Sequence, residues 1–245
     1  MEAAELASSA HGCDALTDLI KVLRDKNGCP WDRKQDPDTI KRYVLEEAYE
    51  VAEAVDNGSP AMVCEELGDL IFQVVFLACL YEEKGAFSIE DVIRGIIEKM
   101  VRRHPHVFGD KKVRDADEVK ANWHKIKLAE KGSADPGSLL DSIPHNLPAL
   151  MRAHRITERA GRAGFNFPDL SGIFVEIDGA ISQLKDLAQK HDPQKTSREF
   201  GDFLFKIVVL GRMLGMHAEE ALDQALQRFI DKFQAIAPHG THQTP

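Results

Sequence analysis

The chain has 245 residues, of which 43% are hydrophobic and 29% are charged, values typical of a soluble protein with one large core or two small ones. The 40 Asp and Glu residues outnumber the 31 Lys and Arg residues, giving a formal net charge of −9. This balance argues against binding of duplex nucleic acid, which requires a basic surface, but allows a single nucleotide held by a metal ion and a few cations.

Nothing in the sequence indicates a membrane span or a signal peptide. The longest apolar stretch, residues 70–80, is interrupted by Gln73 and is too short to cross a bilayer. The N-terminal segment MEAAELASSAHG is acidic and has no basic start followed by an apolar run. The four cysteines have neither zinc-site spacing nor a Cys-x-x-Cys pair, so we expect reduced thiols and a cytoplasmic protein.

Helical periodicity runs along the chain and strand-like alternation is nearly absent, which predicts an all-α fold. Ser88 and Asp91 have the spacing of a capping box. Other clear starts have a Ser or Asp cap directly before proline, at Asp36-Pro37, Ser59-Pro60 and Asp192-Pro193. The predicted helices span residues 12–25, 38–57, 60–84, 89–103, 115–131, 145–162, 171–190, 194–215 and 217–235.

A weak internal repeat relates the two halves of the chain. EEAYEVAEAV, ELGDLIFQVVFL and EKMVRRH in the first half parallel VEIDGAISQL, EFGDFLFKIVVL and QRFIDKF in the second. The segment 132–148 is rich in Gly, Ser and Pro and is interpreted as a linker. We therefore predict a domain at 1–131 and a duplicated domain at 149–245. The central helix of each copy is apolar nearly all round, so we expect the other half or another subunit to cover it.

Two neighbouring predicted helices carry the most informative side chains, five carboxylates. Residues three and four apart share a helix face, and a turn near 57–60 would place the two acidic faces opposite each other. Two like charges about 4 Å apart repel by roughly 4 kcal/mol at an effective dielectric near 20, so the acids must protonate or bind a cation. The five residues are Glu46, Glu47, Glu50, Glu66 and Asp69.

Magnesium suits this group, because it prefers a few carboxylates together with water and substrate phosphates. The Glu-x-x-His pairs of di-iron bundles do not occur at the required spacing. We therefore predict a Mg²⁺ site in which Mn²⁺ can substitute. The alternative is a solvated acidic face that keeps the protein soluble.

Cations and a possible base-binding loop flank the acidic helices. Lys99, Arg102 and Arg103 project to one side of one helix and Lys127 lies on the next, and guanidinium groups suit phosphate oxygens. The alternative for them is a solvated basic patch at a helix end. In the loop NGCPWDRKQ, tryptophan could stack on a nucleobase or anchor packing, and two polar neighbours could bond the base or sugar. These loop residues are Trp31, Asp32 and Gln35.

The segments LRDKNGCPWDRKQ, LEEAYEVAEAV, CEELGDLIFQVVF and RRHPHVFGD together resemble the MazG nucleotide pyrophosphohydrolase family. The resemblance covers residues 12–131 and resumes through LPALMRAHRITERAGRAGF and EFGDFLF to about 235. It implies tandem all-α domains with four-helix-bundle cores, assembled as a homodimer or higher. It also implies Mg²⁺-dependent hydrolysis of nucleoside triphosphates to monophosphate and pyrophosphate, with a broad base range and a house-cleaning role in the nucleotide pool.

The resemblance also assigns roles to individual residues. The metal ligands it implies are Glu47, Glu50, Glu66 and Asp69. Glu46 completes the acidic motif, and Glu46 or Glu47 is the expected general base. The groups that neutralise the phosphates are Arg102, Arg103 and Lys127, and Trp31 lies near the base.

The second half departs from this pattern. Val175 and Gly179 stand where the acidic motif requires glutamates, whereas Glu176, Glu199 and Asp202 survive. We therefore expect catalysis in the first half. Two other functions remain open: pyrophosphohydrolysis of phosphoribosyl-ATP or a modified nucleotide, and a non-catalytic helical module that binds a protein partner.

Overall fold

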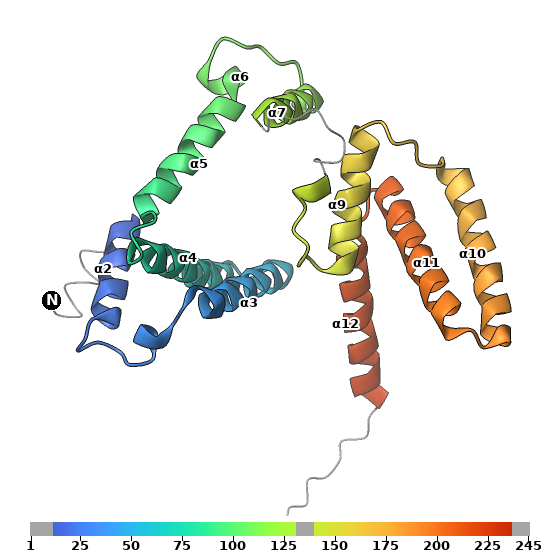
Figure 1. Cartoon of the computed structure of the whole chain (residues 1–245), viewed down its shortest axis with the longest axis horizontal. Coiled ribbons are helices and arrows are strands. Elements are labelled where there is room, and N and C mark those ends of the chain that lie inside the picture. The colour runs from blue at the N-terminus through green and yellow to red at the C-terminus, as the bar shows by residue number, and fades with distance from the viewer. Residues whose placement is uncertain (1–11, 131–139, 237–245) are drawn as a thin grey trace, which may run out of the picture. The chain divides into compact units, whose positions relative to one another are not determined.

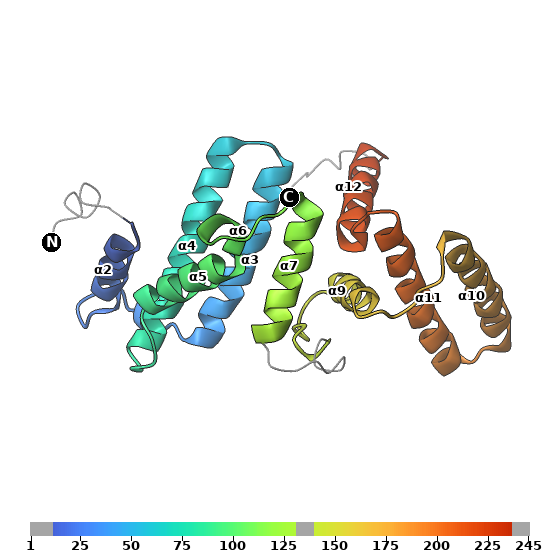
Figure 2. The same cartoon turned by 90° about the horizontal axis from the view of Figure 1, so that it is seen from above.

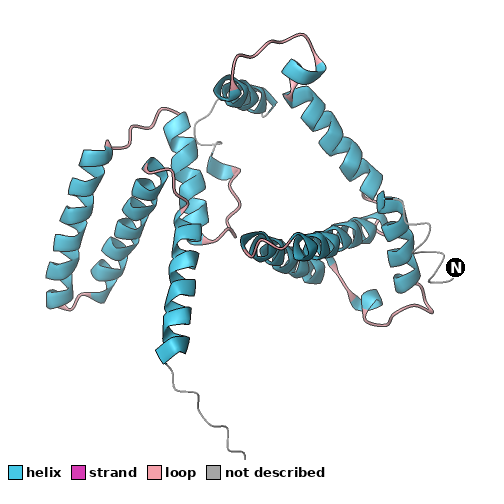
Figure 3. Cartoon of the chain, turned by 180° about the vertical axis from the view of Figure 1, so that it is seen from behind, coloured by secondary structure: helices cyan, strands magenta, loops and turns pink. Residues whose placement is uncertain are grey.

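A computed structural model of the chain describes residues 12–130 and 140–236 (Figure 1). The chain divides into two compact units, Met1–Lys127 and Leu128–Pro245. Within the described residues all regular secondary structure is helical, which confirms the all-α prediction (Figure 3). Residues 132–139 of the predicted linker lie outside the described residues. None of the described helices is both long and apolar enough to span a bilayer.

The first unit contains most of the predicted helices close to their expected positions. A 3₁₀ turn and the short helix α6 were not predicted; α6 begins at Pro105, the proline that ends α5. The elements are α2 (Gly12–Arg24), η1 (Asp32–Lys34), α3 (Pro37–Asp56), α4 (Pro60–Glu82), α5 (Ile89–Arg103), α6 (Pro105–Phe108) and α7 (Ala116–Glu130).

The predicted helix starts are confirmed by their caps. The side chains of Asp36 and Ser59 each accept a hydrogen bond from the backbone N–H three residues later. Ser88 and Asp91 form a reciprocal capping box at the start of α5. Gly58 has a φ of +69°, which glycine adopts without strain, and this allows the tight turn from α3 to α4.

The α3–α4 pair is the framework of the first unit. The two helices lie side by side and antiparallel, and α2 packs against α4 (Figure 2). The core gathers around the C-terminal half of α4, at Ile20, Ile40, Val75, Phe76, Ala78, Cys79, Leu80 and Ile89. Nearer the start of α4, Ile71 and Val74 remain 47% and 41% exposed. The cover expected for the apolar face of α4 is therefore incomplete within this unit.

The second unit repeats the helical hairpin. Its helices are α9 (Ala149–Arg162), α10 (Leu170–Lys190), α11 (Pro193–Met213) and α12 (Ala218–Ile236). Helices α10 and α11 pack as an antiparallel pair, and α9 contacts both α11 and α12 (Figure 1). The prediction that a helix begins at residue 145 is wrong: α9 begins at Ala149, because the ψ of 140° at Pro148 is not helical.

Candidate functional site

Three carboxylates from two helices converge in the first unit. Glu47 lies on α3, and Glu66 and Asp69 lie one turn apart on α4. One carboxylate oxygen from each residue lies within 4.8 Å of the other two. Among the described residues, no other group of three or more Asp, Glu, His or Cys side chains is as close. The antiparallel pairing of α3 and α4 produces this convergence, as the helical spacing predicted.

The electrostatics of the group show that its members repel one another. Desolvation raises the pKa of Glu47, and the charges of Glu50 and Asp69 raise it further. Gln73 opposes this increase by donating from Nε2 to Oε1 of Glu47 at 3.4 Å. Desolvation also raises the pKa of Glu66, and the negative charge of Glu50 makes the next largest contribution to that increase. The mutual repulsion of the carboxylates thus contributes to both increases in pKa.

The donor set fits a hard divalent cation. An octahedral Mg²⁺ holds oxygens at about 2.1 Å, which places opposite ligands about 4.2 Å apart, so the observed spacing requires only small side-chain rotations. Glu47 and Glu66 are half-buried, whereas Glu50 and Asp69 are exposed. This leaves one side of the site open to water and substrate. Glu46 is exposed on α3 and lies outside the converging group.

The cations of α5 and α7 meet on an aromatic ring. The guanidinium carbon of Arg103 and the Nζ of Lys127 lie 5.2 and 5.5 Å from the centroid of the Trp123 ring. Arg102 and Lys99 are exposed on the same helix as Arg103. Sequence interpretation missed Trp123, although its position one helical turn before Lys127 was a usable signal. Beyond the turn that joins them, α5 diverges from the α3–α4 pair (Figure 1).

The loop before α3 presents one aromatic ring and buries its polar side chains. Trp31 is 56% exposed and its ring lies 6.0 Å from that of Tyr43. Asp32 and Gln35 are buried. Gln35 Nε2 donates to the carbonyl of Trp31 at 3.0 Å, and the Arg24 guanidinium donates to the carbonyls of Asp32 and Gln35. Trp31 is thus accessible to a ligand, whereas Asp32 and Gln35 shape the loop.

The second unit does not rebuild the carboxylate group. Glu176 on α10 and Glu199 and Asp202 on α11 form no comparable cluster within the described residues. Gly179 stands at the position that corresponds to Glu50 in the sequence repeat, so the second unit has no carboxylate there. Lys206 occupies the repeat position of Gln73 and places a cation on α11. The conditions for metal binding are therefore met in the first unit only, as far as the described residues show.

Comparisons with known proteins identify the family that the chain resembles. The MazG nucleotide pyrophosphohydrolase domain model matches residues 35–108, which include all four predicted ligands. The nucleoside triphosphate pyrophosphohydrolase/pyrophosphatase MazG of Thermotoga maritima is 42% identical over 223 residues, covering 91% of this chain and 84% of the relative. The nucleoside triphosphate pyrophosphohydrolase of Escherichia coli K12 is 41% identical over 228 residues, covering 91% and 86%. A crystal structure of a mazG-related protein from T. maritima, 30% identical, covers 46% of this chain and 97% of that chain with a TM-score of 0.41.

Proposed function

The chain belongs to the MazG nucleotide pyrophosphohydrolase family, and we propose that it hydrolyses nucleoside triphosphates to nucleoside monophosphate and pyrophosphate. The observation that carries this proposal is the convergence of Glu47, Glu66 and Asp69, with Glu50 beside them. Such a group suits a divalent ion that grips a triphosphate tail. The names of the two bacterial relatives describe the same activity.

The reaction follows from the charges of the site. Glu47, Glu50, Glu66 and Asp69 would hold Mg²⁺ or Mn²⁺, which supplies Lewis acidity at the phosphate oxygens. Glu47, or alternatively Glu46, accepts a proton from the water that attacks the α-phosphorus in line. The bond from the α-phosphorus to the bridging oxygen breaks, and pyrophosphate leaves.

The leaving pyrophosphate needs cations, and three are proposed for this role. Arg102, Arg103 and Lys127 offset the charge that builds up on the leaving group. Arg103 and Lys127 share the Trp123 ring, which keeps the two cations near each other despite their mutual repulsion.

A broad base range agrees with the loop that carries Trp31. Stacking on an aromatic ring tolerates any base, because every base presents a π-face. Asp32 and Gln35, whose side chains would otherwise read base edges, are buried. This supports a role in removing various unwanted nucleotides from the pool. The four cysteines are all free, which fits the reducing cytoplasm.

We further propose a homodimer as the minimal functional assembly. Helix α5 leaves a stripe of apolar side chains exposed, at Val92, Ile93, Ile96, Ile97 and Val101. The α3–α4 pair leaves a second set exposed, at Leu45, Tyr49, Leu67, Ile71 and Val74. Contiguous apolar surface of this kind marks an interface. A second copy would complete a four-helix core around the carboxylates and could bring the cations of α5 to them.

The test is a Mg²⁺-supplemented assay of the common ribo- and deoxyribonucleoside triphosphates and phosphoribosyl-ATP, with separate detection of pyrophosphate and orthophosphate. Glu50→Gln should abolish pyrophosphate release while the helical circular dichroism is unchanged, because the metal site loses a charged ligand. Glu176→Gln, the matched change in the repeat, should retain activity. Full activity of Glu50→Gln would refute the metal role, and an inactive Glu176→Gln would place catalysis in the other unit.

A further inference from the structure

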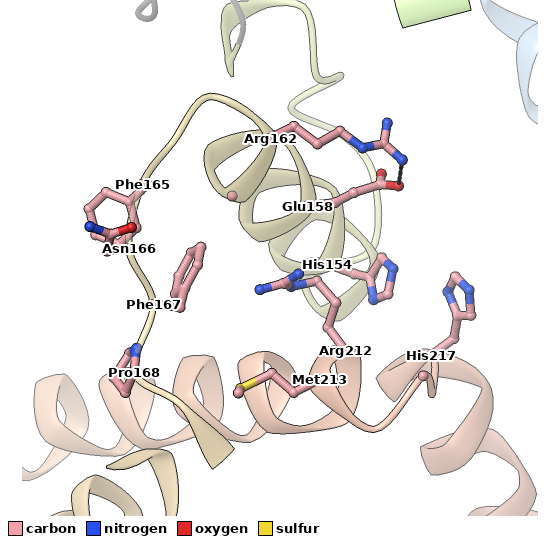
Figure 4. Close-up of a pocket in the computed structure, with 12 residues that line it drawn as sticks. His154, Glu158, Arg162, Phe165, Asn166, Phe167, Pro168, Arg212, Met213 and His217 are labelled. Carbon is pink, nitrogen blue, oxygen red and sulfur yellow. Dashed lines mark hydrogen bonds and ion pairs between the residues drawn. The ribbon is translucent and has the colours of Figure 1, made fainter. Parts of the chain in front are cut away.

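A cavity of about 660 Å³ lies in the second unit, far along the chain from the carboxylates (Figure 4). It is bounded by α9, the loop from α9 to α10, the end of α11 and the start of α12. Its volume lies within the range of about 300–1,000 Å³ that is usual for small-molecule sites. None of the four proposed metal ligands lines it.

Positive charge predominates in this cavity. Its basic groups are His154, Arg162, Arg212 and His217. The carboxylate that faces them, Glu158, is already engaged: its oxygens lie 2.6 Å from Arg162 Nη2 and 3.3 Å from Arg155 Nη1. The imidazoles of His154 and His217 stack, with centroids 4.2 Å apart. Because Glu158 and Arg162 neutralise each other, Arg212 is the charge in this lining that would attract an anion, with the two imidazoles beside it.

Two nitrogens in the cavity wall need a hydrogen-bond partner. The guanidinium of Arg212 lies 5.1 Å from the centroid of the Phe167 ring and extends from α11 toward that ring (Figure 4). Its Nε is buried and bonds to no described residue, and the same holds for Nδ1 of His154. A buried polar atom without a partner is costly, and both nitrogens are covered by protein atoms, so an anionic oxygen would supply the missing acceptor only after these side chains turn toward it. Burial lowers the pKa of His154, the neighbouring His217 lowers it further, and the charge of Glu158 opposes the decrease.

The mouth of the cavity is aromatic. Phe165 is 62% exposed and meets Phe167 edge-on, with ring centroids 4.8 Å apart. A large, exposed ring beside a cationic interior suits a ligand that combines an anionic group with a planar ring system. Inorganic phosphate would use the cations but not this ring.

We propose that the cavity binds a nucleoside phosphate, with Arg212 and the stacked histidines holding the phosphate and Phe165 covering the base. The site is built from other residues than the proposed hydrolytic centre and lies within the unit whose carboxylate motif is incomplete. The second unit would thus bind a nucleotide without hydrolysing it.

The experiment titrates AMP into the full chain in EDTA, so that the proposed hydrolytic centre has no metal. The readout is the imidazole NMR resonances of His154 and His217, assigned from His154→Gln and His217→Gln. AMP should shift both. Arg212→Gln should weaken binding about tenfold through loss of charge-assisted hydrogen bonds, whereas Arg198→Gln, which removes an exposed charge from the same helix, should leave affinity unchanged.

The Phe165→Ala variant and a comparison of AMP with inorganic phosphate test the proposal even if Arg212→Gln fails to fold. Phe165→Ala should weaken binding of AMP but not that of inorganic phosphate, because the ring contacts only the base. If AMP and phosphate bind equally and Phe165→Ala affects neither, the nucleoside assignment is overturned. If AMP leaves both histidine resonances in place, or if Arg198→Gln weakens binding as much as Arg212→Gln, the site itself is overturned. None of these outcomes depends on hydrolysis at the first unit.

Discussion

Gln73 is the one strongly polar side chain in the apolar run of α4, and its amide reaches Oε1 of Glu47 at 3.4 Å. Groups that orient a metal ligand typically change metal affinity by 10–100-fold. We expect Gln73→Leu to weaken Mn²⁺ binding about tenfold, measured by calorimetry. Loss of this donor also raises the pKa of Glu47 further, so protons compete better with the metal, and the defect should be larger at pH 6 than at pH 8.

Gln183→Leu is the control, since Gln183 is exposed on α10 of the other unit. Its Mn²⁺ affinity should match that of the unmodified chain at both pH values. Equal affinity of the Gln73 and Gln183 variants would show that Gln73 does not position Glu47.

The two tryptophans should have separable effects on substrate binding. Trp123 contacts Arg103 and Lys127, which we assign to the phosphates, whereas Trp31 is assigned to the base. Trp123→Leu should raise KM for ATP about fivefold, because each cation–π contact contributes roughly 0.5–1 kcal/mol. It should also weaken inhibition by inorganic tripolyphosphate. Trp31→Leu should raise KM but leave tripolyphosphate inhibition unchanged; equal loss of inhibition in both variants would contradict this division of roles.

For individual residues, the sequence was informative where side chains share a helix face because of their spacing. Glu47 and Glu50 share a face of α3, and Glu66 and Asp69 share a face of α4, so their convergence required only that the helices pair. Gln73 and Trp123 instead contact side chains on other helices. Such contacts depend on side-chain rotamers, which the spacing of residues in the sequence does not determine. The burial of Asp32 and Gln35 depends on the path of an irregular loop, and spacing carries no information about such a path.

Among the secondary-structure elements, helices with strong caps were predicted best. Asp36, Ser59 and Ser88 each supply an acceptor to the first turn, and the observed helices begin directly after them. The error at α9 lies upstream of Pro148, where residues 145–147 form a turn and a bend and the ψ of 140° at Pro148 is not helical. Contacts between elements were harder to predict: the ion pair between Arg24 of α2 and Glu83 at the end of α4 joins residues distant in sequence.

This ion pair predicts a pH-dependent contribution to stability. Arg24 holds Glu83 through two bonds of 2.7 Å and lowers the pKa of that carboxyl. A lowered carboxyl pKa adds stability above the unfolded-state value of about 4.3 and loses it as the pH falls through the folded-state value. We expect Glu83→Gln to lower the free energy of unfolding by about 1 kcal/mol at pH 7, and the difference to disappear below about pH 3.

Urea denaturation followed by tryptophan fluorescence measures this effect in the first unit, which contains both tryptophans. Glu82→Gln is the matched control, because Glu82 makes a single, more exposed contact with Lys21 at 3.3 Å. A smaller loss is expected for it. Equal losses in the two variants, or a loss for Glu83→Gln that persists at low pH, would contradict a special contribution of the Arg24 pair.

For the whole molecule, the two units share a helical hairpin but differ in their carboxylates. The antiparallel hairpin is kept in α10–α11, as in α3–α4. Gly179 removes an acid and Lys206 introduces a cation, so the repulsion that would favour a metal is weaker. The two hairpins could be predicted because hairpin cores depend on apolar spacing, which both halves share. The cavity beside Arg212 could not, since it is built from a loop and the ends of three helices.

Assembly is the property of the whole molecule on which the proposed activity depends. If the α5 stripe packs against a second copy, Ile97→Asp should separate the dimer, because a buried, unpaired carboxylate is strongly unfavourable. Sedimentation velocity should show a monomer at concentrations where the unmodified chain is a dimer, and pyrophosphate release should fall with it. Val22→Asp, at a similarly exposed apolar residue on α2, should remain dimeric and active. A monomeric but fully active Ile97→Asp chain would show that one copy contains the complete site, and the cations of α5 would then have to reach the carboxylates of their own chain.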